Sequence, residues 1–337
     1  MPEETILEVR HLRTSFLQGN SEMRAVDDMS YSIKKGECVA IIGESGSGKS
    51  VSALSVLRLI PYPPGVIKGG EVIFKGRDLM KLTNAEMEEI RGNEISMIFQ
   101  EPSTALNPVI PIGKQIEENI LLHTKMTKKE AEAHTIELLA RMDIPSPETR
   151  LKDYPFQFSG GMQQRAMIAM AMSCKPDLLI ADEPTTALDV TVQAQVLEQL
   201  NSLRAEFGTS LMIITHNLGI VARYADSVKI VYGGKIVEEG DVDQIFEHPH
   251  HPYTIGLISA VPRLDLPRSH GLHTIEGEPP DMSKIPPKSC AFSQRCKYCT
   301  EVCKTQRPPL TQVEDGHFCA CFHMEEALKE AEEVLTE

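Results

Sequence analysis

The spacing of apolar residues changes along the chain and predicts its elements. Up to about residue 100, short apolar runs alternate with polar turns, which predicts strands at 6–9, 31–33, 38–42, 72–75 and 95–99. From 113 to 171 the apolar residues recur at helical spacing. Two more short apolar strands are expected at 178–181 and 211–215, with a helix at 190–207 between them. Such alternation predicts an α/β fold with a parallel sheet.

The composition changes beyond residue 240. Eight prolines fall between 249 and 287, and six of the eight cysteines follow between 290 and 321. Proline-rich stretches mark boundaries between compact parts of a chain. We therefore expect a main domain at 1–240 with a helical subdomain at about 105–172, then a linker at 241–285 and a cysteine-rich module at 286–337.

Composition also narrows the choice of function. The chain has 337 residues, enough for more than one domain, and a formal net charge of −14 at pH 7. Nucleic acid requires a basic surface, so no nucleic-acid partner is expected. The apolar runs fall short of the ~18 residues needed to cross a bilayer, and the acidic N-terminus lacks an apolar signal region. These features predict a protein of the cytosol, where disulfides are rare.

Residues 43–50 read Gly-Glu-Ser-Gly-Ser-Gly-Lys-Ser and fit the pattern of a phosphate-binding loop. An expected strand precedes the loop and an expected helix at 51–60 follows it, which is the context that the motif requires. Glycines let backbone N–H groups surround a phosphate chain, Lys49 can reach the β- and γ-phosphates, and the Ser50 hydroxyl can bind Mg²⁺. A Gly- and Ser-rich turn that matches by chance is the alternative. The residues expected at the phosphates are Gly43, Ser45, Gly46, Gly48, Lys49 and Ser50.

The apolar strand expected at 178–181 ends in two carboxylates, Asp182 and Glu183. Asp182 is placed to hold Mg²⁺, directly or through water, and Glu183 to polarise a water molecule for attack on the γ-phosphate. An acidic turn at the end of a strand is the alternative. After the phosphate loop, the pair predicts hydrolysis of a nucleoside triphosphate.

A third motif, at 158–165, reads Phe-Ser-Gly-Gly-Met-Gln-Gln-Arg. Ser159 can cap the helix that begins here, and Gly160 and Gly161 expose backbone N–H groups at its positive end. This makes an anion site for which the local sequence supplies no ligand. An ordinary capped helix explains the same residues equally well.

These motifs, in this order, resemble those of the nucleotide-binding subunits of ATP-binding cassette (ABC) transporters over about residues 7–239. The resemblance implies a P-loop NTPase core of the RecA type with an antiparallel β subdomain and an α-helical signature subdomain, the signature beginning at Ser159. It also implies a Q-loop glutamine that helps to bind Mg²⁺, a D-loop aspartate, a switch histidine and an aromatic residue stacked on adenine, which are Gln100, Asp189, His216 and Phe16. A core position explains Phe16 about as well.

Three segments, 43–51, 100–108 and 251–254, resemble the ATPases of dipeptide and oligopeptide importers, and the Ser-Gly-Lys-Ser-Val form resembles their D-type subunit. The resemblance implies an ATP-hydrolysing motor that works head to tail with a second, F-type ATPase subunit. Two transmembrane permease subunits and an extracytoplasmic peptide-binding protein complete such an importer, with this chain at the cytoplasmic face of the membrane. A nickel-importer ATPase and a soluble ABC ATPase that moves no solute are the alternatives.

The C-terminal cysteines are too numerous for accident, and they are Cys290, Cys296, Cys299, Cys303, Cys319 and Cys321. Their spacing suits a four-thiolate site that staples a small loop-rich module, and either an iron–sulfur cluster or Zn²⁺ fits it. The importer subgroup often carries a similar extension, which implies a [4Fe–4S] cluster on Cys290, Cys296, Cys303 and Cys321. Cys299 and Cys319 are extra to that pattern, and ligation through Cys296, Cys299 and Cys303 is an alternative with workable spacing.

Overall fold

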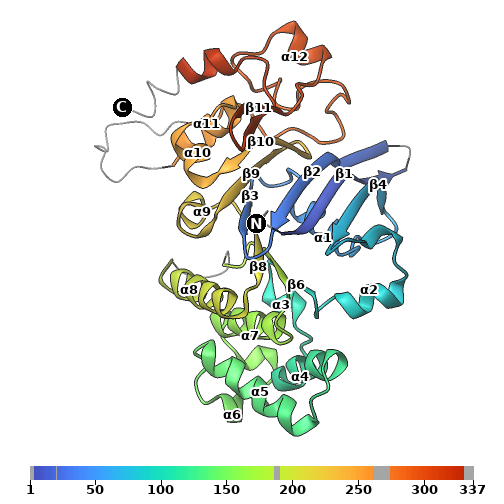
Figure 1. Cartoon of the computed structure of the whole chain (residues 1–337), viewed down its shortest axis with the longest axis vertical. Coiled ribbons are helices and arrows are strands. Elements are labelled where there is room, and N and C mark those ends of the chain that lie inside the picture. Colours follow the sequence, from blue (N-terminus) through green and yellow to red (C-terminus); the bar gives the residue numbers. More distant parts are fainter. Residues whose placement is uncertain (1–3, 20, 186–189, 262–273, 330–337) are drawn as a thin grey trace. The chain divides into compact units, whose positions relative to one another are not determined.

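The computed structural model describes residues 4–19, 21–185, 190–261 and 274–329 (Figure 1). By their internal contacts the residues form two units. The first contains the N-terminal residues up to Leu7, Ile33–Cys38 and Phe74–Ile214, and the second contains Glu8–Ser32, Val39–Ile73 and the chain from Thr215 onward. No described helix combines the length and the apolar character needed to cross a membrane.

Three parallel strands form the centre of the first unit. They are β6 (Ile95–Ile98), β7 (Leu178–Asp182) and β8 (Ser210–Thr215). β7 pairs with both neighbours, with Leu178 opposite Ile95 on one side and opposite Ser210 on the other. Every residue of the three strands is buried, as is usual for parallel strands covered on both faces. The predicted strands in this region are therefore confirmed to within a residue at each end.

The segment between β6 and β7 is helical, as the spacing predicted. Its helices are α3 (Pro102–Ala105), α4 (Ile112–His123), α5 (Lys128–Arg141), α6 (Pro147–Arg150) and α7 (Gly160–Met172), and Figure 1 shows α4 to α7 gathered together. Ile116, Ile120 and Leu139, which set the helical spacing in the sequence, are all buried. The remaining helices of this unit are α2 (Asn84–Ile90), α8 (Val190–Phe207) and the short 3₁₀ turns Leu79–Lys81 and Pro155–Gln157.

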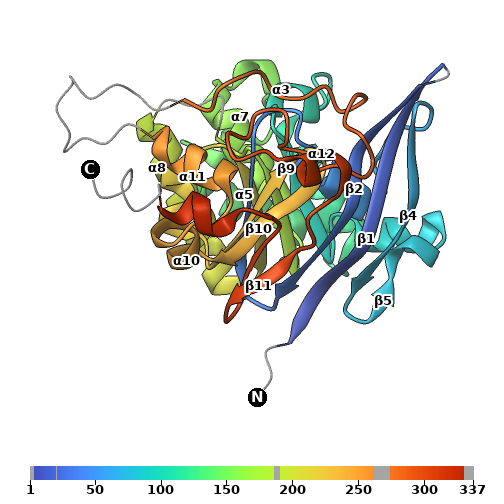
Figure 2. The ribbon, with the colours of Figure 1, turned by 90° about the horizontal axis from the view of Figure 1, so that it is seen from above.

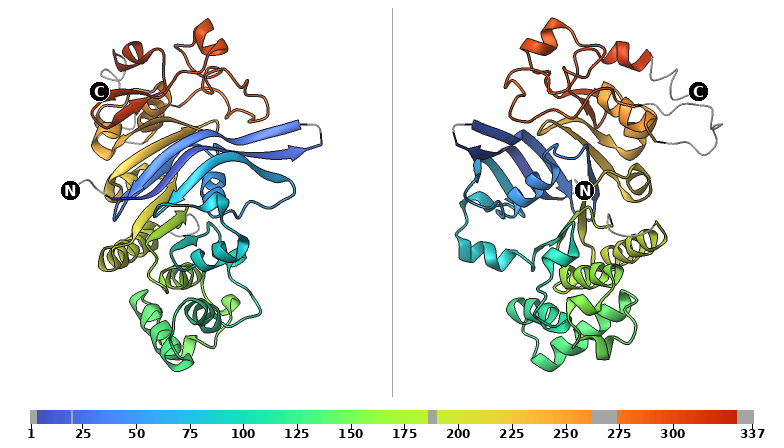
Figure 3. Two further views of the ribbon diagram at one scale, coloured as in Figure 1. Left: turned by 45° about the vertical axis from the view of Figure 1, so that its right-hand side comes forward. Right: turned by 180° about the vertical axis from the view of Figure 1, so that it is seen from behind.

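Long antiparallel strands make up one part of the second unit. β1 (Thr5–Gln18) lies between β2 (Ser21–Lys34) and β4 (Gly65–Phe74). The short β5 (Arg77–Asp78) comes next in the chain and belongs to the first unit. Figures 2 and 3 show the long strands side by side. Only 6–9 and 31–33 were predicted on the first two strands. The rest of β2 mixes buried, half-buried and exposed positions without strict alternation, so it lacks the period-2 signal of a strand.

The other part of the second unit contains the phosphate loop and the C-terminal residues. β3 (Cys38–Ile42) runs parallel to β9 (Ser227–Tyr232), and antiparallel pairing continues through β10 (Lys235–Asp241), β12 (His317–Cys319) and β11 (Thr311–Glu314). The helices here are α1 (Lys49–Val56), α9 (Leu218–Tyr224), α10 (Val242–Glu247), α11 (Pro252–Ser259) and α12 (Glu301–Thr305). The cysteine-rich residues thus extend the sheet that carries the phosphate loop.

The stretch expected to be a linker, 241–285, contains two helices. Asp241 caps α10 through a capping box with Gln244, and the His251 ring caps α11 by accepting the Tyr253 N–H. The prolines that suggested a loop fit this arrangement, because Pro252 opens α11 at a position where proline is tolerated. The domain limits at residues 240 and 285 stay predictions.

Candidate functional site

The phosphate loop has glycines where the neighbouring backbone leaves no room for a side chain. A Cβ added to Gly43 would lie 2.1 Å from the Val231 carbonyl oxygen, and a Cβ on Gly48 would lie 2.1 Å from that of Ala25. Gly48 also has a φ of +103°, which favours glycine. From the sequence, we attributed these glycines to the need for phosphate to approach the backbone N–H groups. The structure adds that they also let the loop pack against the strands beneath it.

The start of α1 is arranged to receive an anion. Gly48 precedes the helix and supplies no side-chain cap, and the N-terminus of a helix attracts anions through its backbone N–H groups. The side chain of Lys49 is buried, and its Nζ donates 2.8 Å hydrogen bonds to the carbonyl oxygens of Gly43 and Glu44. Ser45 and Gly46 are exposed at the tip of the loop, and Ser50 is half-buried. These residues fit a triphosphate chain with Mg²⁺.

In the first unit, Gln100 and Glu183 meet directly. The Gln100 side-chain amide donates to a carboxylate oxygen of Glu183 at 2.9 Å. Glu183 has a φ of +46°, a conformation that is uncommon for a residue with a side chain and that concentrates at functional sites. Its backbone N–H donates to the Ile214 carbonyl oxygen at 2.8 Å. Asp182, just before it, is buried at the end of β7. Two of the predicted catalytic residues and the predicted Mg²⁺ ligands of this unit therefore lie together.

The signature segment has the cap that the sequence predicted. The Ser159 hydroxyl accepts the Met162 N–H at 3.3 Å, and Gly160 is exposed with no atom within 4 Å of the place of a Cβ. Gln163 donates from its side-chain amide to the carbonyl oxygens of Pro155 and Phe158. It thereby fixes the turn that leads into α7 and leaves the start of the helix open to an anion.

The remaining predicted residues are placed more simply. His216 is exposed directly after β8, and Phe16 is half-buried on β1, with its ring beside Gly65. Asp189 lies outside the described residues. The loop, His216 and Phe16 belong to the second unit, whereas Gln100, Asp182, Glu183 and Ser159–Gly161 belong to the first. Their meeting in one nucleotide site stays a prediction.

Five of the C-terminal thiols lie near one another. Each pair among Cys290, Cys296, Cys303 and Cys321 interacts electrostatically, and Cys299, which is extra to the predicted four, interacts in the same way with Cys290, Cys296 and Cys303. The Cys290 N–H donates to the Cys303 carbonyl oxygen at 2.8 Å. Burial raises the pKa of Cys290 to about 11 and that of Cys321 to about 12. Thiols of such high pKa are protonated at neutral pH unless a metal binds them.

The spacing of the thiols bears on which metal fits. Within the described part of the chain, no three cysteine sulfurs lie within 4.8 Å of one another. A tetrahedral zinc site, with Zn–S bonds of about 2.3 Å, brings its sulfurs to roughly 3.8 Å apart. The thiolates of an iron–sulfur cluster bind different iron ions and lie farther apart. The two kinds of site therefore differ in the thiolate spacing that they impose, and the metal content of the purified protein distinguishes them.

Sequence reasoning missed that the C-terminal region touches the phosphate loop. The Tyr253 hydroxyl accepts the Glu44 N–H at 2.9 Å, and Arg295 forms a 2.6 Å ion pair with the Glu44 carboxylate. The C-terminal region thus contributes two side chains to the surroundings of the phosphate loop. No local signal reveals these contacts, because about 210 and 250 residues separate the partners.

Comparison with known proteins identifies the family. The chain matches the ABC transporter family over residues 26–186 and the C-terminal region of oligopeptide/dipeptide transporters over 237–303. It is 48% identical to the oligopeptide transport ATP-binding protein OppD of Bacillus subtilis, over 93% of this chain and 87% of that protein. It is 46% identical to the dipeptide transport ATP-binding protein DppD of the same organism, over 97% of each. This chain is an ABC transporter ATPase.

The ABC ATPase also resembles solved cassettes. It aligns with the dimeric ATP-binding cassette MJ0796 in a post-hydrolysis state bound to ADP and Pi, at 25% identity and a TM-score of 0.64. The alignment covers 98% of that cassette but 70% of this chain. The ABC ATPase therefore carries a substantial amount of structure beyond the cassette itself.

Proposed function

We propose that this ABC ATPase is the motor subunit of an importer for dipeptides or oligopeptides. The observation that carries the proposal is the match of 237–303 to the C-terminal region of oligopeptide/dipeptide transporters, in a chain with an intact phosphate loop. The relatives named above, which are oligopeptide and dipeptide transport ATP-binding proteins, support it. In such an assembly the chain binds to the cytoplasmic face of the membrane.

The phosphate loop supplies binding in this proposal. The N–H groups of the loop and of the start of α1 hold the phosphates, and Lys49 exchanges its two carbonyl partners for the β- and γ-phosphates. Ser50 and Asp182 hold Mg²⁺, which neutralises charge that develops on the phosphates. Phe16 stacks on the adenine ring.

Glu183 and its neighbours supply the chemistry. Glu183 accepts a proton from the attacking water, and Gln100, which already donates to Glu183, helps to position that water and Mg²⁺. His216 contacts the γ-phosphate. The strained backbone of Glu183 fixes the direction of its carboxylate at the end of β7.

Each site needs a second ATPase subunit, in the proposal an F-type chain. The exposed start of α7 at Ser159–Gly161 is an anion site without a local ligand, and it completes the site of the partner. By its resemblance to the D-loop aspartate, Asp189 is proposed to belong to the same interface. ATP thereby stabilises a closed dimer, and hydrolysis removes that preference.

The helical region of the first unit offers a surface for the two permease subunits. Val109 is 77% exposed, Leu122 71% and Phe156 73%, which is unusual for side chains of this size. Gln115 holds the segment around Val109 in place through hydrogen bonds with Asn107 and Ile110. Large apolar side chains exposed in this way suit contact with a protein partner.

The experiment that tests the function uses the assembled importer in membrane vesicles. ATP turnover should rise when a peptide-binding protein loaded with a dipeptide or oligopeptide is added, and labelled peptide should accumulate. Lys49→Ala is the control and should stop both. ATP-driven uptake of Ni²⁺ without uptake of peptide would instead support the nickel importer.

The cysteine site is proposed to hold a [4Fe–4S] cluster on Cys290, Cys296, Cys303 and Cys321, with a structural role. Protein purified without oxygen should be brown and contain about four iron ions per chain. Serine at any of these four positions should remove the colour, whereas Cys299→Ser and Cys319→Ser should not. A colourless protein with one zinc ion would contradict the cluster.

A further inference from the structure

The second residue of the phosphate loop is held by two side chains from the C-terminal region. Tyr253, at the start of α11, binds the backbone N–H of Glu44, and Arg295 binds its carboxylate. The Lys49 ammonium in turn binds the Glu44 carbonyl oxygen. The backbone N–H, the carboxylate and the backbone carbonyl oxygen of Glu44 are therefore each bound by a side chain, and these three contacts fix the position of the loop.

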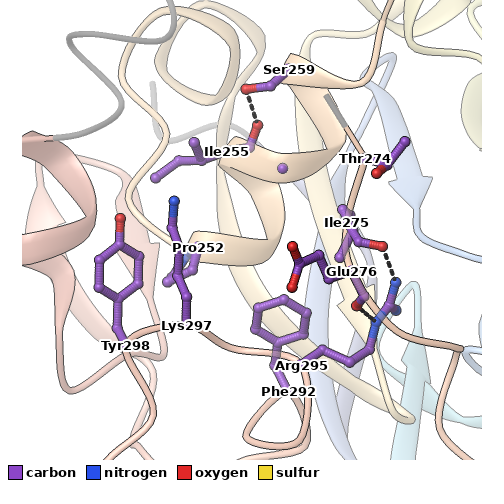
Figure 4. A pocket seen from close by; sticks show the side chains of 11 residues that line it. Pro252, Ile255, Ser259, Thr274, Ile275, Glu276, Phe292, Arg295, Lys297 and Tyr298 are labelled. Atoms are coloured by element: carbon purple, nitrogen blue, oxygen red, sulfur yellow. Dashed lines mark hydrogen bonds between the residues drawn. The ribbon is translucent and has the colours of Figure 1, made fainter. Parts of the chain in front are cut away.

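Arg295 is itself fixed from several sides. Its side chain is 5% exposed, and besides Glu44 it donates to the carbonyl oxygens of Ile275 and Glu276 (Figure 4). Its guanidinium also lies over the rings of Tyr232 and Phe292. A buried cation held this firmly keeps its partner carboxylate in place.

The same short segment carries the cysteines. Arg295 directly precedes Cys296, and the backbone N–H groups of both residues donate to the Phe292 carbonyl oxygen. The ring of Phe292 packs against Tyr232 and Tyr253. The folded conformation of residues 290–303 therefore determines where the Arg295 guanidinium lies.

We propose that Arg295 is a positioning residue of the nucleotide site, through which the folded cysteine segment 290–303 sets the affinity for nucleotide. The inference rests on the proposed nucleotide site. Arg295 neutralises Glu44, a carboxylate within the loop that must receive an anionic triphosphate, and holds it away from the phosphates. Without Arg295, Glu44 repels the phosphates and the carbonyl oxygens that hold Lys49 lose their fixed position.

The test measures dissociation constants of Mg·ADP and of an unhydrolysed Mg·ATP analogue for the full-length chain. Arg295→Met should weaken binding by about tenfold or more. Glu44→Gln should stay within about threefold of the wild type, because it removes the repulsive charge together with the ion pair. The double variant should bind as Glu44→Gln does. Arg295→Lys, which keeps the charge and loses the fork of donors, should lie between.

A matched control comes from the same end of the chain. Arg307 forms a 2.9 Å ion pair with Asp27 on β2 and does not contact the loop. Arg307→Met also removes a cation paired with a carboxylate, although the Arg307 side chain is 30% exposed, so it should change thermal stability without changing nucleotide affinity. An equal loss of affinity in Arg307→Met would overturn the inference, because the effect would then be general.

A second measurement tests the link to the cysteine segment. Coupling between two sites is reciprocal, so Mg·ADP should slow amide hydrogen exchange in 290–303 of the wild type and of Arg307→Met. In Arg295→Met this protection should be lost. The inference would be overturned if the protection persisted, if Arg295→Met bound nucleotide with wild-type affinity, or if the effects of the Arg295 and Glu44 changes were additive. None of these outcomes would overturn the proposed function. A wild-type chain that binds no nucleotide, while remaining folded, would overturn the proposed function and this inference with it.

Discussion

Glu183 joins a strained backbone to a fixed carboxylate, which makes it the sharpest single-residue test of the chemistry. Glu183→Gln keeps the oxygen that accepts from Gln100 and removes the base. We expect nucleotide affinity to stay near that of the wild type, and hydrolysis in the assembled complex to fall by about 10²–10⁴-fold. Equilibrium binding measures the nucleotide affinity, and steady-state release of phosphate measures the hydrolysis. Near-normal turnover would remove Glu183 from the role of base.

Two glycines of the phosphate loop form a matched pair. Gly48 has a backbone oxygen 2.1 Å from the place of a Cβ, whereas Gly46, with a φ of +77°, has no atom within 4 Å. Gly46→Ala should cost about 1–2 kcal/mol of unfolding free energy from its left-handed backbone alone. Gly48→Ala should cost more and should also weaken nucleotide binding, because the loop must shift. Urea unfolding and nucleotide titration of both variants decide this, and equal losses would contradict the steric argument.

At this scale the sequence located the residues of the loop, the carboxylates and the cap, because each stands in a local pattern with a physical reason. It did not reveal that Gly43 and Gly48 pack on backbone oxygens of distant strands, nor the contacts of Tyr253 and Arg295 with Glu44. Those partners are set by the tertiary fold. One sequence carries no local signal for them.

At the scale of elements, a buried carboxylate joins β10, the start of α11 and β12. Glu238 is fully buried and accepts hydrogen bonds from the backbone N–H groups of His250 and His251 and from the His317 ring. β10 and the start of α11 lie 12 residues apart at this contact, and β12 joins them from 79 residues away, so three elements share one charge. Burial of that charge is stabilising only while all its partners are present.

The same junction predicts a pH dependence of stability. Burial lowers the pKa of His251 from 6.5 to about 4. Below pH 6.5 the unfolded chain therefore binds a proton that the folded chain does not, and stability falls between pH 6.5 and 4. The loss of unfolding free energy from this ring should reach about 3 kcal/mol at pH 4. Urea unfolding across this range measures it.

His251→Asn is the control for that prediction. Asparagine can still cap α11, and it does not titrate. The difference in unfolding free energy between the wild type and His251→Asn should therefore shrink as the pH falls from 6.5 to 4. Parallel stability curves would show that His251 does not contribute.

Elements were predicted well where a whole strand or helix has one regular pattern. The continuous apolar runs of β3, β7 and β8 and the helical spacing in α4 and α5 left little choice. The hairpin of β1 and β2 was found only in part, since half-buried positions interrupt its alternation. The helices α10 and α11 were missed because proline and histidine dominate their surroundings.

At the scale of the whole molecule, the signature segment and the phosphate loop serve different ATP molecules in the proposed dimer. Ser159→Arg would place a long cation at the exposed start of α7. The isolated chain should bind nucleotide as before, whereas the assembled complex should lose hydrolysis at the partner's loop. Lys49→Ala should instead weaken nucleotide binding by the isolated chain. Reduced affinity in isolated Ser159→Arg would contradict the division of the site between subunits.

The assembly itself was predicted from the sequence only through family resemblance. Charge and composition predicted no nucleic-acid partner and no membrane-spanning segment, but they do not indicate a second subunit. The open anion site at Ser159–Gly161 is the physical feature that calls for one. This site points to a second subunit because the neighbouring sequence supplies no anion to bind there.

Strand β12 also covers the backbone of β10. Glu238 and Glu239 of β10 pair with Cys319 and Phe318, and beyond β12 the sheet continues with β11, which is four residues long and largely exposed. A short polar strand at a sheet edge is a poor template for another chain. A chain that ended near residue 285 would leave β10 as a longer edge with apolar residues and a buried glutamate, Glu238, without its bond from the His317 ring. The cysteine-bearing end thus protects the ABC ATPase against self-association by strand pairing.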